Sequence, residues 1–363
     1  MRPLSYCTNV HPAEDLPGVL AQLDACALPV RERMGADRLG LGLWLTADVA
    51  AALAADPAER TRLRAELDAR GLEVVTLNAF PYGGFHDAVV KHRVYRPRWT
   101  DPARAGYTLD CARVLAGLLP DDAESGSIST LPLGWREPWT PADDDAAARA
   151  LDALTEGLRA FDRPIRLAVE PEPGCVLDTV SDAVTWLAGR VDPTAVGLCL
   201  DTCHLAVSFA DPAAAIAEIA AGGLDVVKVQ MSAALHVPDP RDPAARAALT
   251  AFDEPRYLHQ TREAGAGAVR AADDLDEALT SLPGEGPWRV HFHVPLHARP
   301  AAPLSATTDV LSAALAALAA QQNRTPHLEV ETYTWSVLPA AYRQDLIGGI
   351  AAELEFAAGL VAR

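Results

Sequence analysis

The stretch VGLCLDTCH, residues 196–204, decides the fold of this chain. Its apolar run over residues 196–200 has the length and composition of a buried strand. Asp201 ends the run and His204 follows three residues later, so ligand-type side chains stand where a strand gives way to a loop. In parallel α/β folds, that edge of the sheet carries the chemistry. The stretch therefore predicts a buried parallel strand with a functional site at its carboxyl end.

The same rhythm runs along the whole chain. Short β-rich runs alternate with stretches of helical period, which is the pattern of βα units around a parallel sheet. Eight β-rich runs begin near residues 3, 39, 72, 127, 165, 196, 225 and 327. Helices are expected at 47–69, 101–118, 143–160, 178–189, 212–221, 306–320 and 339–361. Eight strands suit a closed (β/α)8 TIM barrel, and we expect this α/β fold.

A ninth β-rich run, WRVHFHV at residues 288–294, does not fit a count of eight. Residues 233–287 before it are rich in Pro, Asp, Gly and Ala. Long functional loops are typical of the top face of a barrel. We therefore expect residues 233–297 to form an insertion or lid between the seventh and eighth strands. Because neither half of the chain contains a linker or a charge run, residues 1–363 are expected to form a single domain.

The composition predicts a soluble globular protein of the cytoplasm. Apolar residues make up 50% of the chain and charged residues 22%, which allows a large core. The 31 basic and 49 acidic side chains give a net charge of −18, which opposes binding to nucleic acid or anionic lipid. No run approaches the ~18 apolar residues of a membrane span, and a signal-peptide core is missing. The six cysteines form no CxxC pair, and the sequence has no Gly-rich nucleotide loop, so we expect reduced thiols and no NAD or ATP.

Acidic residues and a histidine fall at the expected strand ends. Glu170 ends IRLAVE, Asp201 and His204 close the stretch quoted above, and Glu331 ends the strand that begins at His327. Buried acids are costly unless a cation or hydrogen bonds compensate, and three acids with a histidine suit a divalent ion. The set predicts a metal site. The alternative for each residue taken singly is an ion pair with Arg or Lys at the rim.

Other polar groups are candidates for binding a small polar molecule. Each has a structural alternative: an ordinary turn for residues 81–84, packing for Trp135, and a solvated loop instead of a substrate lid for residues 252–261. Glu329 shares a strand face with Glu331, because side chains alternate along a strand. The substrate-binding candidates are Asn78, Tyr82, His86, Trp135, Arg256, Tyr257, His259, His293, His297 and Glu329.

At these strand ends the chain resembles the xylose isomerase-like barrel superfamily, which includes hydroxypyruvate isomerase, ketose 3-epimerases and repair enzymes of the endonuclease IV type. The superfamily pattern is a strand-five glutamate, a strand-six Asp-x-x-His, a strand-seven histidine and a strand-eight glutamate. Glu170, Asp201, His204 and Glu331 match it, and Gln230 stands where the histidine is expected. The resemblance implies a divalent cofactor (Zn, Mn, Mg or Co), with Gln230 as an oxygen ligand in place of the imidazole.

Segments from end to end of the chain are similar to those of the EboE family of metabolite traffic proteins within that superfamily. They include LSYCTNVHPAE, TLNAFPYGGFH, LAVEPEPG, DTCHLAVSF, KVQMSAAL, VHFHVPLH and LEVETYTW. This resemblance implies a role in preparing or moving a secondary-metabolite precursor for export, with other proteins of the same operon as partners. It implies no particular reaction and leaves the oligomeric state open.

Two functions from different classes are compatible with these residues. The first is a metal-dependent isomerase or epimerase acting on a small polyhydroxy or keto compound. The resemblance then implies that Glu170 and Glu331 act as the acid/base pair and that Lys228 stabilises an enediolate oxygen. The second is a non-catalytic binding or handover protein on the same barrel, which Gln230 favours. A repair endonuclease is disfavoured by the net charge of −18.

The segment HFHVPLH, residues 291–297, contains three of the ten histidines. His291 and His293 share one face if the segment is extended. In zinc-dependent relatives, a segment between strands seven and eight contributes further ligands. We expect His293 or His297 to face the pocket, filling the vacancy at Gln230 or binding substrate, while His291 only lines its strand.

Overall fold

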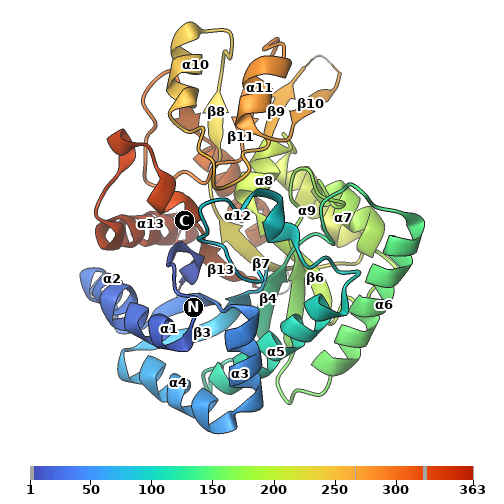
Figure 1. Cartoon of the computed structure of the whole chain (residues 1–363), viewed down its shortest axis with the longest axis vertical. Coiled ribbons are helices and arrows are strands. Elements are labelled where there is room, and N and C mark those ends of the chain that lie inside the picture. Colours follow the sequence, from blue (N-terminus) through green and yellow to red (C-terminus); the bar gives the residue numbers. More distant parts are fainter. Residues whose placement is uncertain (1–3, 266, 322–324, 363) are drawn as a thin grey trace.

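In the computed structural model, which describes residues 4–265, 267–321 and 325–362, the chain forms a closed barrel of eight parallel strands (Figure 1). The strand order is β1-β13-β7-β6-β5-β4-β3-β2, and β13 closes the barrel by pairing with both β7 and β1. The strands are β1 (Ser5–Cys7), β2 (Leu39–Trp44), β3 (Leu72–Asn78), β4 (Gly126–Thr130), β5 (Ile165–Val169), β6 (Val196–Asp201), β7 (Val226–Met231) and β13 (His327–Val330). The predicted TIM barrel and its eight strands are confirmed.

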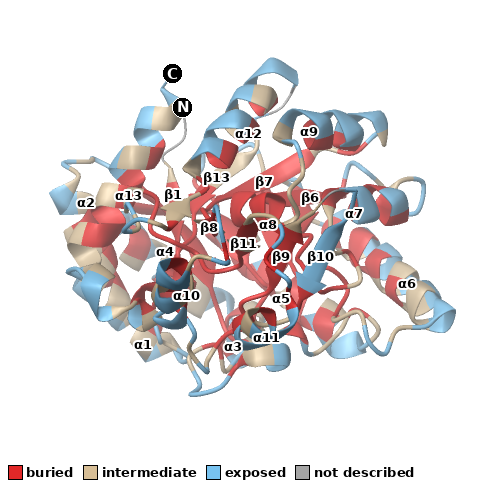
Figure 2. Ribbon diagram, turned by 90° about the horizontal axis from the view of Figure 1, so that it is seen from above, coloured by how far each residue is buried: buried red, intermediate tan, exposed pale blue. Residues whose placement is uncertain are grey.

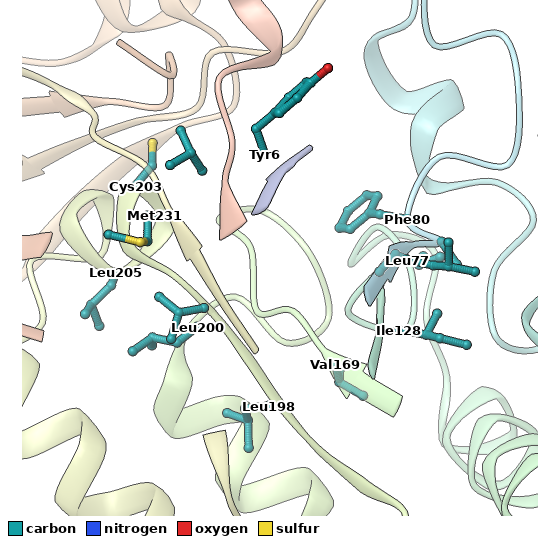
Figure 3. Close-up of a cluster of buried hydrophobic side chains, with 14 of the residues drawn as sticks. Tyr6, Leu77, Phe80, Ile128, Val169, Leu198, Leu200, Cys203, Leu205 and Met231 are labelled. Atoms are coloured by element: carbon teal, nitrogen blue, oxygen red, sulfur yellow. The ribbon is translucent and has the colours of Figure 1, made fainter. Parts of the chain in front are cut away.

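All the barrel strands except β13 are buried along their whole length, which is why most of them read as near-continuous apolar runs. Figure 3 draws part of this core, in which Ile128, Val169, Leu198 and Met231 come from four neighbouring strands. Each of these side chains is at most 1% exposed. The packed interior gives a rigid frame for the side chains at the carboxyl ends of the strands.

Two charged side chains form an ion pair inside the barrel. Lys228 Nζ on β7 lies 3.0 Å from Glu329 Oε1 on β13, and both side chains are fully buried. Gly42 on β2 leaves room for this pair, because an added Cβ would lie 1.2 Å from Glu329 Oε2. Burial is the largest single influence on the pKa of Lys228 and lowers it, but Glu329, Cys199 and Cys7 together raise this pKa above its usual value. The pair is therefore charged and self-compensated.

Helices surround the barrel with exposed outer faces and buried inner faces (Figure 2). They are α1 (Leu16–Gln22), the π-helical turn η2 (Leu23–Ala27), α2 (Leu28–Arg33), α3 (Ala47–Ala55), α4 (Pro57–Ala69), α5 (Pro102–Leu118), α6 (Pro141–Leu158), α7 (Val180–Leu187), α8 (Thr202–Val207), α9 (Pro212–Ala221), α12 (Thr308–Gln321) and α13 (Leu346–Val361). Short 3-10 turns are η1 (Thr8–Val10), η3 (Lys91–Tyr95), η4 (Tyr333–Val337) and η5 (Ala340–Tyr342). Among the described helices, none has the length and apolar character needed to cross a membrane.

Two helix predictions need correction, and one helical segment has no counterpart among the predictions. Residues 47–69 form two helices instead of one, because Asp56 accepts hydrogen bonds from the backbone of Ala58 and Glu59 and so caps a new start at α4. The last helix begins after its cap Asp345, since residues before it form η5. The helical segment from α1 to α2 was not predicted.

Between β7 and β13 the chain forms a second sheet, at the top of Figure 1. Its strand order is β10-β9-β11-β8-β12, and every neighbouring pair is antiparallel. Its elements are β8 (Leu235–Val237), α10 (Pro243–Thr250), β9 (Thr261–Ala264), β10 (Val269–Ala272), α11 (Leu275–Ser281), β11 (Trp288–Val290) and β12 (Ser305–Ala306). The ninth β-rich run is thus β11, outside the barrel. The sheet extends to Ala306, beyond the expected boundary at residue 297.

Candidate metal centre

A cavity of about 520 Å³, partly open to solvent, lies at the carboxyl ends of the barrel strands. That volume includes the space through which the cavity opens to solvent. Strand ends, the η3 segment and the insertion all contribute side chains to it. The lining residues are Asn9, Asn78, Phe80, Pro81, Phe85, Val90, Lys91, Val94, Tyr95, Glu170, Glu172, His204, Tyr257, Leu258, His291, His293, Glu331 and Tyr333.

Three buried carboxylates converge beside this cavity: Glu170 and Glu331 line it, whereas Asp201 does not. One oxygen each of Glu170, Asp201 and Glu331 lies within 4.8 Å of the others. Glu170 Oε2 and Asp201 Oδ2 are buried without a hydrogen-bond partner, whereas Glu331 Oε1 accepts from Asn9 Nδ2 (2.7 Å) and Asn78 Nδ2 (2.9 Å). Burial and then the neighbouring acids raise the pKa of Glu170 well above its usual value and the pKa of Glu331 to about 8. Carboxylates this close repel one another and favour a proton or a cation between them.

Asp201 belongs both to this carboxylate set and to a histidine set. Its Oδ1 accepts hydrogen bonds from the backbone N–H of His204 (2.9 Å) and from Ser232 Oγ (2.8 Å), which fixes the carboxylate at the start of α8. Its Oδ2 lies 3.8 Å from His293 Nε2, and neither of these two buried atoms has a hydrogen-bond partner. Both atoms are of the type that ligates metals.

Backbone carbonyls fix the tautomers of two histidines. His204 Nδ1 lies 2.9 Å from the Pro171 carbonyl oxygen, and His293 Nδ1 lies 2.8 Å from the Glu331 carbonyl oxygen. A carbonyl can only accept, so each Nδ1 carries the hydrogen, and Nε2 of the neutral ring keeps a lone pair. Histidines that bind metals are commonly held in this way by their other ring nitrogen.

His291 is oriented in the same manner by an amide. Its Nδ1 lies 2.7 Å from Gln260 Oε1, and the orientation of that amide follows from Gln260 Nε2, which donates to Tyr95 Oη and the Pro173 carbonyl. Burial lowers the pKa of His291 well below its usual value, so the ring is neutral. Its Nε2 faces His204 Nε2 at 3.2 Å. Two lone pairs that face one another at this distance need a proton or a cation between them.

The ligand-type atoms fall into four sets of three, each within 4.8 Å. The sets are Glu170, Asp201 and Glu331; Asp201, His204 and His293; Glu172, His204 and His291; and Cys203, His291 and His293. Mixed carboxylate and imidazole donors suit divalent ions such as Zn²⁺ or Mn²⁺, while the carboxylate set suits a harder ion. Because buried ligand atoms are unpartnered and the imidazole lone pairs converge, these residues fit a divalent cation.

Four of the residues predicted as ligands, Glu170, Asp201, His204 and Glu331, therefore come together. The fifth, Gln230, is paired in register with Asp201, and both atoms of its side-chain amide are buried without a hydrogen-bond partner. It does not line the cavity.

The predicted catalytic Lys228 and the predicted substrate contact Glu329 form the buried ion pair described above. Neither residue lines the cavity.

The substrate-binding candidates at the end of β3 divide into two groups. Asn78 lines the cavity. Tyr82 packs against the Tyr107 ring with a centroid distance of 5.1 Å, and His86 Nε2 donates to the Asn9 carbonyl at 2.7 Å. Trp135 packs against Tyr95 at 5.2 Å. Tyr82, His86 and Trp135 therefore contact lining residues or the core and do not line the cavity themselves.

The insertion candidates divide similarly. Tyr257 and His293 line the cavity. His259 Nδ1 donates to the His291 carbonyl at 2.9 Å and so supports a lining residue from behind. Arg256 donates to Ser336 Oγ, and His297 stacks on Trp335 at 6.3 Å, away from the lining residues. His293 thus faces the pocket as expected.

His291 also faces the pocket, so the expectation that it only lines its strand is wrong: β11 ends at Val290 and the chain turns over the cavity. Sequence reasoning also missed Glu172, which lines the cavity two residues after Glu170. Its spacing was the available signal, because residues two apart in extended chain share a face. Tyr95 and Tyr333 gave no comparable signal.

The fold and these side chains define a barrel protein with a metal-type site at the carboxyl ends of its strands. Residues 32–282 match the family described as xylose isomerase-like TIM barrel, and the chain belongs to that family. No curated protein is significantly similar in sequence.

Solved structures share the fold along the whole chain. An L-ribulose 3-epimerase is 14% identical with a TM-score of 0.54, covering 100% of this chain and 95% of its own. The IOLI protein with a binding zinc atom is 13% identical with a TM-score of 0.53, covering 99% and 98%. A xylose isomerase-like TIM barrel protein from Mycobacterium smegmatis in complex with magnesium is 17% identical with a TM-score of 0.51, covering 99% and 97%.

Proposed function

We propose that this protein is a divalent-metal-dependent enzyme of the isomerase or epimerase type, acting on a small polyhydroxy or keto metabolite. The observation that carries this proposal is Asp201 Oδ2, a buried oxygen without a hydrogen-bond partner, whose carboxylate belongs to both the carboxylate set and the histidine set. A carboxylate with one oxygen fixed by hydrogen bonds and the other unpartnered is prepared for a cation.

Glu170, Asp201, His204 and Glu331 would hold the ion, and His293 would supply the imidazole that Gln230 does not. Zn, Mn, Mg and Co remain candidate ions, and the zinc and magnesium complexes of the fold neighbours support this range. A divalent ion in this position polarises a carbonyl or hydroxyl oxygen of a bound substrate.

Glu170 and Glu331 are the proposed acid/base pair, because both line the cavity and because burial and the neighbouring acids raise the pKa of Glu170 well above its usual value and that of Glu331 to about 8. Asn9 and Asn78 hold one oxygen of Glu331 and so orient the group that moves the proton. Lys228 is paired with Glu329 and does not line the cavity, so the proposed proton transfer does not use it. The L-ribulose 3-epimerase with the same fold supports a reaction of this class.

We further propose, from the EboE-like segments, that the metabolite is a secondary-metabolite precursor prepared for export by proteins of one operon. The alternative is a non-catalytic handover protein on the same barrel, which Gln230 favours because the strand-seven imidazole is missing.

The deciding experiment combines elemental analysis with turnover of ketoses and hydroxy-keto acids by the wild type and Glu331→Gln. We expect the protein to contain at least about one equivalent of a divalent ion, and we expect a chelator to abolish turnover. Glu331→Gln should lower turnover by roughly 10²–10⁴-fold, which is the usual contribution of a general acid or base. Metal-free protein without turnover would contradict the enzyme proposal. Metabolite binding that a chelator leaves unchanged would favour handover.

A further inference from the structure

The cavity has two chemically different halves. We call the polar group of lining residues the floor and the apolar group the wall, and the two groups meet where the Tyr333 ring packs on His293 with a centroid distance of 4.7 Å. The floor consists of Glu170, Glu172, His204, His291, His293 and Glu331, and the wall of Phe80, Phe85, Val90, Val94, Tyr257 and Tyr333. The unpartnered nitrogen of His293 and the unpartnered oxygen of Glu170 belong to the floor.

The hydroxyl groups beside the wall face other protein groups, and that of Tyr333 lies 3.5 Å from His291 Nε2. Tyr257 Oη donates to the Phe85 carbonyl at 3.2 Å, and Tyr95 Oη donates to Glu172 Oε1 at 2.7 Å. Lys91, at the mouth, forms an ion pair with Asp274. A substrate with hydroxyl groups along its whole length would bury some of them against this side without partners, which is costly.

The wall is a preformed aromatic surface. Phe85, Val90, Tyr257 and Tyr333 belong with Trp44 to one buried apolar cluster. The ring centroids of Phe85 and Tyr257 are 5.2 Å apart, those of Phe85 and Tyr333 5.5 Å, and those of Tyr257 and Tyr333 4.8 Å. Aromatic surfaces held in this way bind apolar rings through their area and edge-to-face contacts.

We infer that the substrate is amphipathic: two neighbouring oxygen atoms at one end meet the floor, and an apolar ring at the other end packs on the wall. The oxygen-binding end rests on the proposed function, because it needs the cation. The ring-binding end depends only on the wall. The substrate class is therefore a ring-bearing hydroxy ketone or a close analogue, and a free sugar does not belong to it.

Three probes with the same α-hydroxy ketone group separate these possibilities: α-hydroxyacetophenone, dihydroxyacetone and D-ribulose. Calorimetry on the purified full-length protein, with and without a chelator, measures their affinities. We expect α-hydroxyacetophenone to bind at least about tenfold more tightly than the other two, since each group added to an apolar pocket contributes roughly tenfold or more. D-ribulose binding as tightly as the phenyl compound, or no binding of the phenyl compound, would overturn the inference.

Two variants test the wall directly. Val90→Thr keeps the side-chain volume and adds a hydroxyl, so it should weaken α-hydroxyacetophenone by roughly tenfold and leave dihydroxyacetone unchanged. Val191→Thr, at the opposite end of the barrel before β6, is the matched control and should change neither. Equal effects of both variants, or none at Val90, would count against the wall as the ring site.

The chelator arm keeps this inference separate from the proposed function. A preference for the phenyl compound that persists in metal-free, inactive protein supports the ring site and removes the proposed reaction. Metal-dependent turnover of D-ribulose without a preference for the phenyl compound would support the proposed reaction and remove the ring site.

Discussion

Two groups of buried charges on neighbouring barrel strands differ in how their charges are compensated. Inside the barrel, Lys228 and Glu329 compensate one another at 3.0 Å. At the strand ends, Glu170, Asp201 and Glu331 meet without a cationic side chain among them. The ion pair is complete as folded, whereas the acid set needs something from solution. The ion pair therefore has a structural role, whereas the acid set has the properties of a binding site.

The largest effect is expected from breaking the ion pair. Lys228→Met removes the partner of Glu329 and leaves a carboxylate fully buried, which should lower the free energy of unfolding by about 3–5 kcal/mol. Urea denaturation measures the change. The double variant Lys228→Met/Glu329→Gln should recover part of the loss. A single variant as stable as the wild type would mean that Glu329 is already neutral.

Glu353 shows a third way to compensate a buried acid, because hydrogen-bond donors surround it instead of a cation. The donors are Leu296 N–H, Thr332 Oγ1 and Trp335 Nε1. Burial outweighs these bonds and raises its pKa from 4.5 to about 7. The folded state then holds the proton more tightly than the unfolded state. This contribution to stability is complete below about pH 4.5 and is lost as pH rises through 7.

At about 1.4 kcal/mol per pKa unit, the loss is roughly 3 kcal/mol. Denaturation midpoints from pH 5 to 8 should fall in the wild type and be flatter in Glu353→Gln. Identical slopes would contradict the raised pKa of Glu353.

The acid set should be stabilised by the ion that it lacks. Added Zn²⁺ or Mn²⁺ at roughly 100 times its dissociation constant should raise the free energy of unfolding by about 2.7 kcal/mol, and a chelator should reverse the gain. Asp201→Asn should lose this response, whereas Asp152→Asn, an exposed change on α6, should keep it. Thermal unfolding with and without ion provides the measurement. An equal response of both variants would show that the ion binds elsewhere.

The smallest expected effect comes from crowding the ion pair without removing a charge. Gly42→Ala places a Cβ in the space of the Glu329 carboxylate and should cost about 1–3 kcal/mol. Gly83→Ala, with no atom within 4 Å of the added Cβ, is the control and should be nearly neutral. Comparable losses in the two variants would contradict a tightly packed pair.

Much of the barrel and of the acid set could be predicted from the sequence, because both follow from local pattern. Apolar runs predict strands, and the carboxyl ends of parallel strands meet at one edge of the sheet. Glu170, Asp201 and Glu331 could therefore be grouped from the sequence alone. Alternation also distinguishes the strand faces. Alternation does not show how far along the barrel a side chain lies. The sequence therefore could not distinguish Lys228 and Glu329, which do not line the cavity, from the residues of the floor.

The rest of the site depends on long-range geometry. His291 enters the cavity because β11 ends and the chain turns, and the length of β11 is set by pairing with β8 and β9. Its ring is then aimed by Gln260 from another loop. The aromatic wall joins Phe85, Tyr257 and Tyr333 from three distant segments. Sequence periodicity does not predict contacts between segments that lie so far apart in the chain.

The place of the accessory sheet between β7 and β13 has a kinetic consequence. The final barrel strand pairs with β7 across the whole insertion and with β1 at the other end of the chain, so barrel closure has the highest sequence separation of any step. His291 and His293 reach the cavity only when the insertion is in position. During folding the candidate metal centre should therefore be the last part to mature, and pulse-labelling hydrogen exchange should report late protection at β13 and β11.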